Sequence, residues 1–316
     1  MDSFKIESFQ SADAMRKPLS EIDFGLSNDR WIEHDSHIFG TLYYRGIFKW
    51  IQFVEAVLPS EEHLNFERLH LAPLEGCRIY TQMNTGDWRW DTQNQLPAGA
   101  TVVHVIFASP MTHLTDVPAD QHGCLLYRTI VDIRWDICRT PKMSSWMLVG
   151  LIPCPQKDAN IIDEACDSAV GTSLSQLKHL DITGPSLKWE CADGFQRWWY
   201  PLLAACVVDY PLQGMVAQVS YGSYLMREIP KGVRMGHSIF RPLDYSRDQD
   251  IYLELLEDNN IDSLHTLGAH PNRNQFWWYP LCNVCRLWQP DELHQLRQGL
   301  DKDLLHQLLR NLKRDR

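Results

Sequence analysis

The chain has 316 residues, of which 44% are hydrophobic and 22% charged, as in a folded globular protein with one large core or two modest ones. Its formal net charge of −10 argues against a dominant nucleic-acid-binding surface. The N-terminus lacks the basic flank and apolar run of a signal peptide, and no apolar stretch is long enough to span a bilayer. We therefore expect an intracellular protein whose nine scattered cysteines are free thiols.

The first part of the chain predicts little regular structure. Residues 1 to about 40 are polar and predict a loose arm, while Leu42–Pro59 has helical spacing and stops at a proline. We therefore treat 1–75 as an N-terminal arm with a helical segment, and 76–316 as the main domain. At the start of that domain, Cys77–Met83 predicts a short strand, and the tryptophan-rich residues after it predict a turn or short helix.

Strand signals dominate the middle of the chain. Val102–Ser109, Cys124–Ile133 and Trp146–Cys154 are apolar, β-branched segments separated by turn-forming residues, so they predict three consecutive strands. Ile161–Leu180 then has helical periodicity. Tyr200–Pro211 is a further apolar run that predicts a fourth strand.

The last part of the chain predicts an irregular insertion followed by a helix. The insertion covers about 212–288 and is rich in glycine and polar residues. Pro290 and Asp291 are typical helix-start residues. The helix after them carries an apolar stripe suited to self-association: Leu293, Leu296, Leu300, Leu304, Leu308 and Leu312.

This order of elements predicts an α/β (α+β) fold, namely a ribonuclease-H-like mixed sheet flanked by helices, with an inserted irregular region. In that fold, acids after the first and fourth strands and on a late helix converge on one face of the sheet. Carboxylates suit Mg²⁺, and two such ions can activate water and stabilise a leaving oxygen in phosphodiester chemistry.

The candidate catalytic and metal-binding acids are Asp209, at the end of the fourth strand, and Asp291 or Glu292 in the first turn of the last helix. Each also has an ordinary explanation. Asp209 suits a strand-to-loop position, and an acid in a first turn caps the helix and complements its dipole. The sequence has no P-loop, GxGxxG, GxSxG or HExxH motif, which counts against nucleotide-dependent and serine-hydrolase functions.

Two further patterns allow a functional and a structural interpretation. Cys282 and Cys285 form a single CxxC pair, which supplies only two of the four ligands of a zinc site, and nothing fixes the distance to His265 and His270. We therefore do not favour zinc there. The tryptophan-rich segments DWRWD, RWWYP and FWWYP suit either base stacking or core packing, of which packing is the commoner.

Five blocks of sequence resemble Plavaka-type transposases of fungi, relatives of the Kyakuja–Dileera–Zisupton group of DDE transposases. The blocks are RIYTQMNTGDWRWDTQNQLPAGATVVHVIFASPMTHLT, WMLVGLIPCPQK, ADGFQRWWYPLLAACVVDYP, EIPKG and WQPDELHQLRQGLDKDLLH. They occur in the family's order and cover roughly residues 30 to 313. The resemblance implies a ribonuclease-H-like core that cuts and joins DNA with divalent metal.

The resemblance also implies that part of the site has been lost. Where family members carry an aspartate–lysine pair before THLT, this chain has Pro110 and Met111. Asp209 matches the second acid, and Asp291 or Glu292 the third. The family's CPxC zinc knuckle is absent, since 224–227 read YLMR, and the chain looks truncated relative to family members.

Together these observations predict a transposase-derived pseudoenzyme of DDE type with little or no strand cleavage. Mg²⁺ would be an ancestral cofactor that is no longer bound, and DNA an ancestral partner that is bound weakly or not at all. Its location would be the nucleus if it works as a transposase relative, and otherwise the cytoplasm. The alternatives are a non-catalytic binding or scaffold protein, and an open reading frame with no selected function.

Overall fold

The computed structural model describes residues 32–36, 40–57, 64–71, 76–109, 111–115, 121–138, 145–153, 168–183, 187–190, 194–208, 213–214, 217, 252–266, 269 and 274–288. By its internal contacts the chain divides into two units. Unit 1 comprises residues 1–204 and 275–282, and unit 2 comprises 205–274 and 283–316. The domain boundary predicted at residue 75 remains a prediction.

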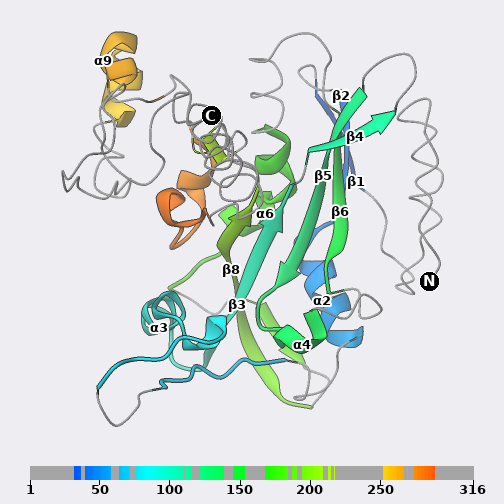
Figure 1. The fold of residues 1–316 in the computed structure, drawn as a ribbon, viewed down its shortest axis with the longest axis vertical. Helices are drawn as coiled ribbons and strands as arrows, with labels where there is room; N and C mark the ends of the chain where they lie inside the picture. Colours follow the sequence, from blue (N-terminus) through cyan, green and yellow to red (C-terminus); the bar gives the residue numbers. More distant parts are fainter. Residues whose placement is uncertain are drawn as a thin grey trace, which may run out of the picture. The chain divides into compact units, whose positions relative to one another are not determined.

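The main feature is one eight-stranded sheet (Figure 1). Its strands follow the order β1-β2-β6-β5-β3-β8-β7, and β4 pairs with β5 beside this path. The strands are β1 (Ile32–Ser36), β2 (Gly40–Tyr44), β3 (Ala100–Ala108), β4 (Met111–Thr115), β5 (Gln121–Ile130), β6 (Met147–Pro153), β7 (Leu187–Glu190) and β8 (Gln196–Val207).

The centre of the sheet has a ribonuclease-H-like arrangement. β3, β5 and β6 form an antiparallel meander, and β8 returns to lie on the free side of β3. Four predicted strands therefore form, in the spatial order third, second, first, fourth. The predicted α+β fold class is confirmed.

Both faces of the central strands are covered. On β3, Val102 projects from one face and Val103 and Val105 from the other, yet all three are fully buried. Eight of the twelve residues of β8 are buried as well. Continuous apolar runs of this kind require an element packed on each side of the sheet. The apolar runs in the sequence therefore predicted these strands correctly.

Different elements cover the two faces of β3. Phe107 lies opposite Arg128 of β5, so both side chains project from one face, whereas His104 is an odd number of residues away and projects from the other. Arg128 donates to the carbonyl of Ser173, in the helical segment 168–173. His104 lies against α3 (Asp87–Asn94), which Figure 1 shows beside β3.

The remaining helices are short. Unit 1 contains α2 (Ile47–Val57), η1 (Met83–Thr85), α4 (Trp135–Cys138), α6 (Ser175–Lys178) and η3 (Gln275–Trp278). Unit 2 contains the helical segment 252–257, α9 (Ile261–Thr266) and η4 (Val284–Arg286). Along the described parts of the chain, none of the helices is long and apolar enough to cross a bilayer.

Three local predictions were wrong. The helix predicted from Leu42 begins only at Ile47, because β2 occupies the residues before it and pairs with both β1 and β6. The strand predicted at Cys77–Met83 is a single bridge between Ile79 and Leu71. The turn predicted after Thr112 contains most of β4, which forms because β5 is long enough to pair with it.

Candidate functional site

The acids predicted from the sequence, Asp209, Asp291 and Glu292, lie outside the described residues, as do Pro110 and the leucine stripe of the last helix. Their convergence therefore remains a prediction. Among the residues that the structure describes, no three His, Cys, Asp or Glu side chains form a group that could hold a metal ion.

Position 110 falls between two stretches of one antiparallel ladder. Ala108 at the end of β3 pairs with Tyr127, and Met111 at the start of β4 pairs with Cys124. The two pairs are three positions apart on each strand, so the ladder keeps its register from β3 to β4. A proline at this point in the sequence supplies neither a carboxylate nor a backbone N–H.

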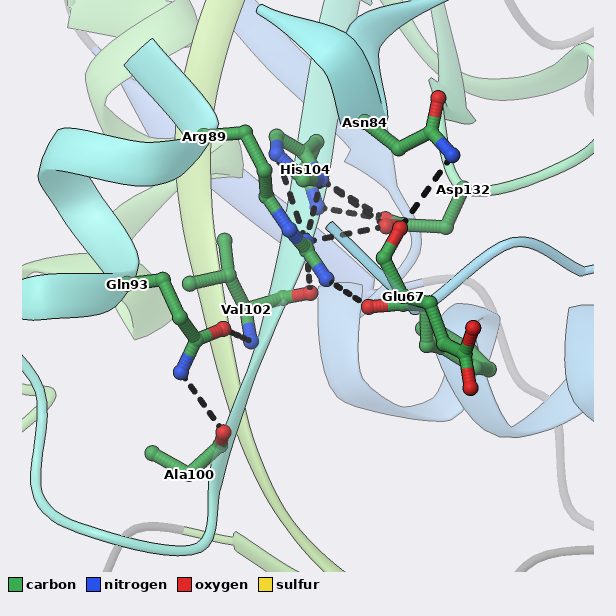
Figure 2. A network of polar contacts seen from close by, with 9 residues as sticks. Glu67, Asn84, Arg89, Gln93, Ala100, Val102, His104 and Asp132 are labelled. Carbon is green, nitrogen blue, oxygen red and sulfur yellow. Dashed lines mark hydrogen bonds and ion pairs between the residues drawn. The ribbon is translucent and has the colours of Figure 1, made fainter. Parts of the chain in front are cut away.

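Six residues before position 110, β3 carries a buried polar network (Figure 2). It consists of Arg89 from α3, His104 from β3 and Asp132 after β5, with side chains that are about 1% exposed. Asp132 Oδ2 accepts the backbone N–H of His104 at 2.8 Å, and Asp132 Oδ1 lies 2.9 Å from His104 Nδ1. Arg89 Nη1 lies 3.2 Å from the same Oδ1.

Arg89 ties this network to the backbone of two segments. Its Nη1 donates to the carbonyl of Val102 at 2.7 Å, and its Nη2 donates to the carbonyl of Phe66. Gln93, one turn further along α3, donates to Ala100 O at 2.8 Å (Figure 2). Helix α3 is therefore fixed to β3 by side chains that bond to the strand's main chain.

The charges in the network are mutually compensating. Burial lowers the pKa of the His104 imidazole, and the nearby Arg89 lowers it further, while Asp132 opposes both. Burial also lowers the pKa of the Arg89 guanidinium, and Asp132 again opposes the shift. A neutral imidazole between one cation and one anion gives the network no net charge.

This network is not a metal centre. The divalent ion implied by the fold requires clustered acids. Asp132 has a guanidinium within hydrogen-bond distance and both oxygens directed at His104, so a second cation there would be repelled. Since Pro110 has no side-chain donor, the predicted set of three acids is also incomplete. Whether Asp209 and Asp291 or Glu292 form a metal site is a separate question, because these residues lie outside the described part of the chain.

A second buried cation lies on the opposite face of β3 and β5. Arg128 is completely buried and donates to the carbonyls of Arg45, at 3.1 Å, and Ser173. No carboxylate pairs with it among the described residues, and burial lowers its pKa to about 10. Ser173 ends the helical segment 168–173, where a cation complements unpaired carbonyls and the helix dipole.

Most of the tryptophan-rich segments are used for packing. Trp88 packs against a core cluster of Leu96, Val102, Tyr200 and Leu202. Trp90 lies under Arg68, whose guanidinium carbon is 4.3 Å from the ring centroid. Trp199 is buried, whereas Trp278 is half exposed.

Cys282 is the member of the CxxC pair whose side chain the structure describes. Burial raises the pKa of the Cys282 thiol to about 12, so this cysteine is protonated in the metal-free chain. The side chain of Cys285 and the whole of His270 lie outside the described residues. Zinc at this pair remains disfavoured.

Sequence reasoning missed the network of Arg89, His104 and Asp132. A histidine within the run VVHVIF and an aspartate within IVDI were visible as polar residues in predicted strands. Buried polar groups need partners, so each was a signal. Arg89 lies 15 residues before His104, and Asp132 lies 28 residues after it, so only the fold brings the three together.

The fold and the order of its central strands define an α+β protein with a ribonuclease-H-like sheet. The sequence profile of the Plavaka transposases matches residues 29–309 of the 316. The chain therefore belongs to the Plavaka transposase family. A search of curated proteins finds no match to it.

Proposed function

We propose that this chain is a transposase relative that retains the fold of a DNA-cleaving enzyme and has lost strand cleavage. The observation that carries the proposal is Pro110, which occupies the place of the first metal-binding acid in the family resemblance. Asp209 and either Asp291 or Glu292 are the remaining acids. With only two carboxylates, a pair of metal ions would be undercoordinated and would hold both reacting oxygens less tightly.

The test is nicking of supercoiled plasmid by the purified full chain, with Mg²⁺ and separately with Mn²⁺. We expect no nicking above the protein-free control. The matched variant is Asp209→Ala, which separates intrinsic activity from a contaminating nuclease. Metal-dependent nicking by the wild-type chain that disappears in Asp209→Ala would overturn the proposal.

A second variant restores the family's residues at this position and tests whether cleavage returns. Pro110→Asp combined with Met111→Lys returns the family's residue pair to the two positions before THLT. Nicking that appears in this variant and again depends on Asp209 would identify the lost acid as the cause of inactivity. DNA is the partner expected from the family, and the nucleus the corresponding location.

A further inference from the structure

The geometry around His104 requires one particular protonation state. Its Nδ1 lies 2.9 Å from the acceptor Asp132 Oδ1 and also 2.9 Å from the donor Arg89 Nη1 (Figure 2). One ring nitrogen cannot donate to the first and accept from the second at the same time. The position of a single proton therefore decides which contact is favourable.

The neutral tautomer with a proton on Nδ1 gives favourable contacts to Asp132 and to both Nη1 hydrogens of Arg89. Nδ1–H then donates to Asp132, while the two Nη1 hydrogens of Arg89 go to Val102 O, at 2.7 Å, and Asp132 Oδ1, at 3.2 Å. In the other neutral tautomer, the lone pair of Nδ1 would face the carboxylate. The first tautomer is therefore the one that the network stabilises.

Adding a second proton breaks this arrangement. The new N–H would be on Nε2, whose one polar neighbour among the described residues is Arg89 Nη1 at 3.4 Å, another donor. The imidazolium would have no acceptor there and would lie against a guanidinium in a fully buried site.

We propose that the network of Arg89, His104 and Asp132 is an acid-sensitive latch, which holds α3 and residues 64–69 on the sheet while His104 is neutral and releases them when it is protonated. Arg89 is the connection, because its guanidinium reaches the strand through Val102 and the segment before α3 through Phe66. Opening would expose Val102 and the core cluster around it. This inference is independent of whether the chain cleaves DNA.

Other charged groups near the latch do not change the direction of its response. Arg68, on the segment before α3, acts on Arg89 and adds to the positive potential. The Glu67 carboxylate points away from the imidazole (Figure 2). Arg128 of β5 projects from the opposite face of the sheet, as its pairing with Phe107 shows.

The direction and size of the effect follow from proton linkage. His104 has a lowered pKa in the closed state and an ordinary pKa of about 6.5 once exposed, so the open state binds more protons as the pH falls below that value. Opening is thus independent of pH above about 7. Between pH 7.5 and 5.5 the opening equilibrium should rise by up to about tenfold.

Amide hydrogen exchange of the full chain, corrected for the intrinsic pH dependence of exchange, measures this opening. We expect protection of the α3 amides to fall about tenfold from pH 7.5 to 5.5 in the wild type. His104→Asn places an amide donor where Nδ1 stands and cannot take up a proton, so its α3 protection should not change. His70→Asn is the matched control, since His70 is exposed and contacts Trp90 of the same helix. It should respond as the wild type does.

A second measurement needs no variant. In the ¹⁵N spectrum of histidine-labelled wild type, the imidazole of His104 should show a solvent-protected, neutral Nδ1–H at pH 7.5. Constant α3 protection across this pH range in the wild type would overturn the latch. So would an undiminished pH response in a folded His104→Asn variant, or a protected imidazole that is already protonated at pH 5.5 while α3 stays closed.

Discussion

Arg128 is a fully buried cation that has no carboxylate paired with it among the described residues. Its guanidinium satisfies two main-chain carbonyls, those of Arg45 and Ser173, which belong to different segments. Arg128→Ala would remove the guanidinium donors from both carbonyls and open a cavity between them. We expect the free energy of unfolding to fall by about 3–5 kcal/mol.

Urea unfolding followed by circular dichroism checks this prediction. Arg128→Lys is the informative comparison, because it preserves the charge and much of the volume but cannot reach two carbonyls with a planar fork. Its loss should be intermediate. Equal stability of the alanine variant and the wild type would contradict a structural role for this cation.

For single residues, the sequence predicts which side chains are buried better than it predicts their hydrogen-bond partners. A polar residue inside an apolar β-branched run, such as His104 or Arg128, is visible as an exception that needs a partner. The partner itself is not visible, because Asp132 and Ser173 reach these residues only through the pairing of β3 with β5 and the packing of the next helix. Interactions this distant in sequence are a property of the fold.

At the scale of elements, the contact between β5 and β6 depends on a glycine. Gly150 lies opposite the buried Leu126, and a Cβ at this position would approach Leu126 Cδ1 to 2.9 Å. Gly150→Ala should therefore lower the free energy of unfolding by about 2 kcal/mol through overpacking. In a Leu126→Ala background the same change should cost about 1 kcal/mol less, because the clashing group has been removed.

A double-mutant cycle in urea measures this coupling. Gly99→Ala is the control glycine, because no heavy atom lies within 4 Å of its Cβ position and its φ of +83° makes any cost one of backbone strain. That substitution should show no coupling to Leu126. Additive effects at Gly150 and Leu126 would mean that the cost of the alanine does not come from its contact with Leu126.

The elements that the sequence predicts well are those with buried apolar runs. β3, β5, β6 and β8 carry continuous runs because helices or loops cover both faces of the sheet. β4 was missed because MTHLT is short and mostly polar, and it forms by pairing with the far end of β5. A strand that is stabilised mainly by pairing with its neighbour has no strong strand signal in its own sequence.

At the scale of the whole molecule, family membership and charge point in different directions. Relatives act on DNA, a polyanion, whereas this chain carries 40 acidic and 30 basic residues. Association with DNA gains most of its sequence-independent free energy from counterions released by lysine and arginine at phosphates. A chain with net charge −10 is repelled at long range unless its basic residues gather on one surface.

This balance predicts weak DNA binding with an unusual salt dependence. For a 20-base-pair duplex followed by fluorescence anisotropy, we expect a Kd weaker than about 10 μM near physiological salt, at the weak end of non-specific binding. The slope of log K against log salt concentration should lie near zero, because few phosphates are neutralised. A slope of about −5 or steeper would correspond to roughly six phosphate contacts and would contradict the prediction. Such a slope would show that a basic surface has been retained despite the acidic composition, and the chain would then be a DNA-binding relative that has lost cleavage alone.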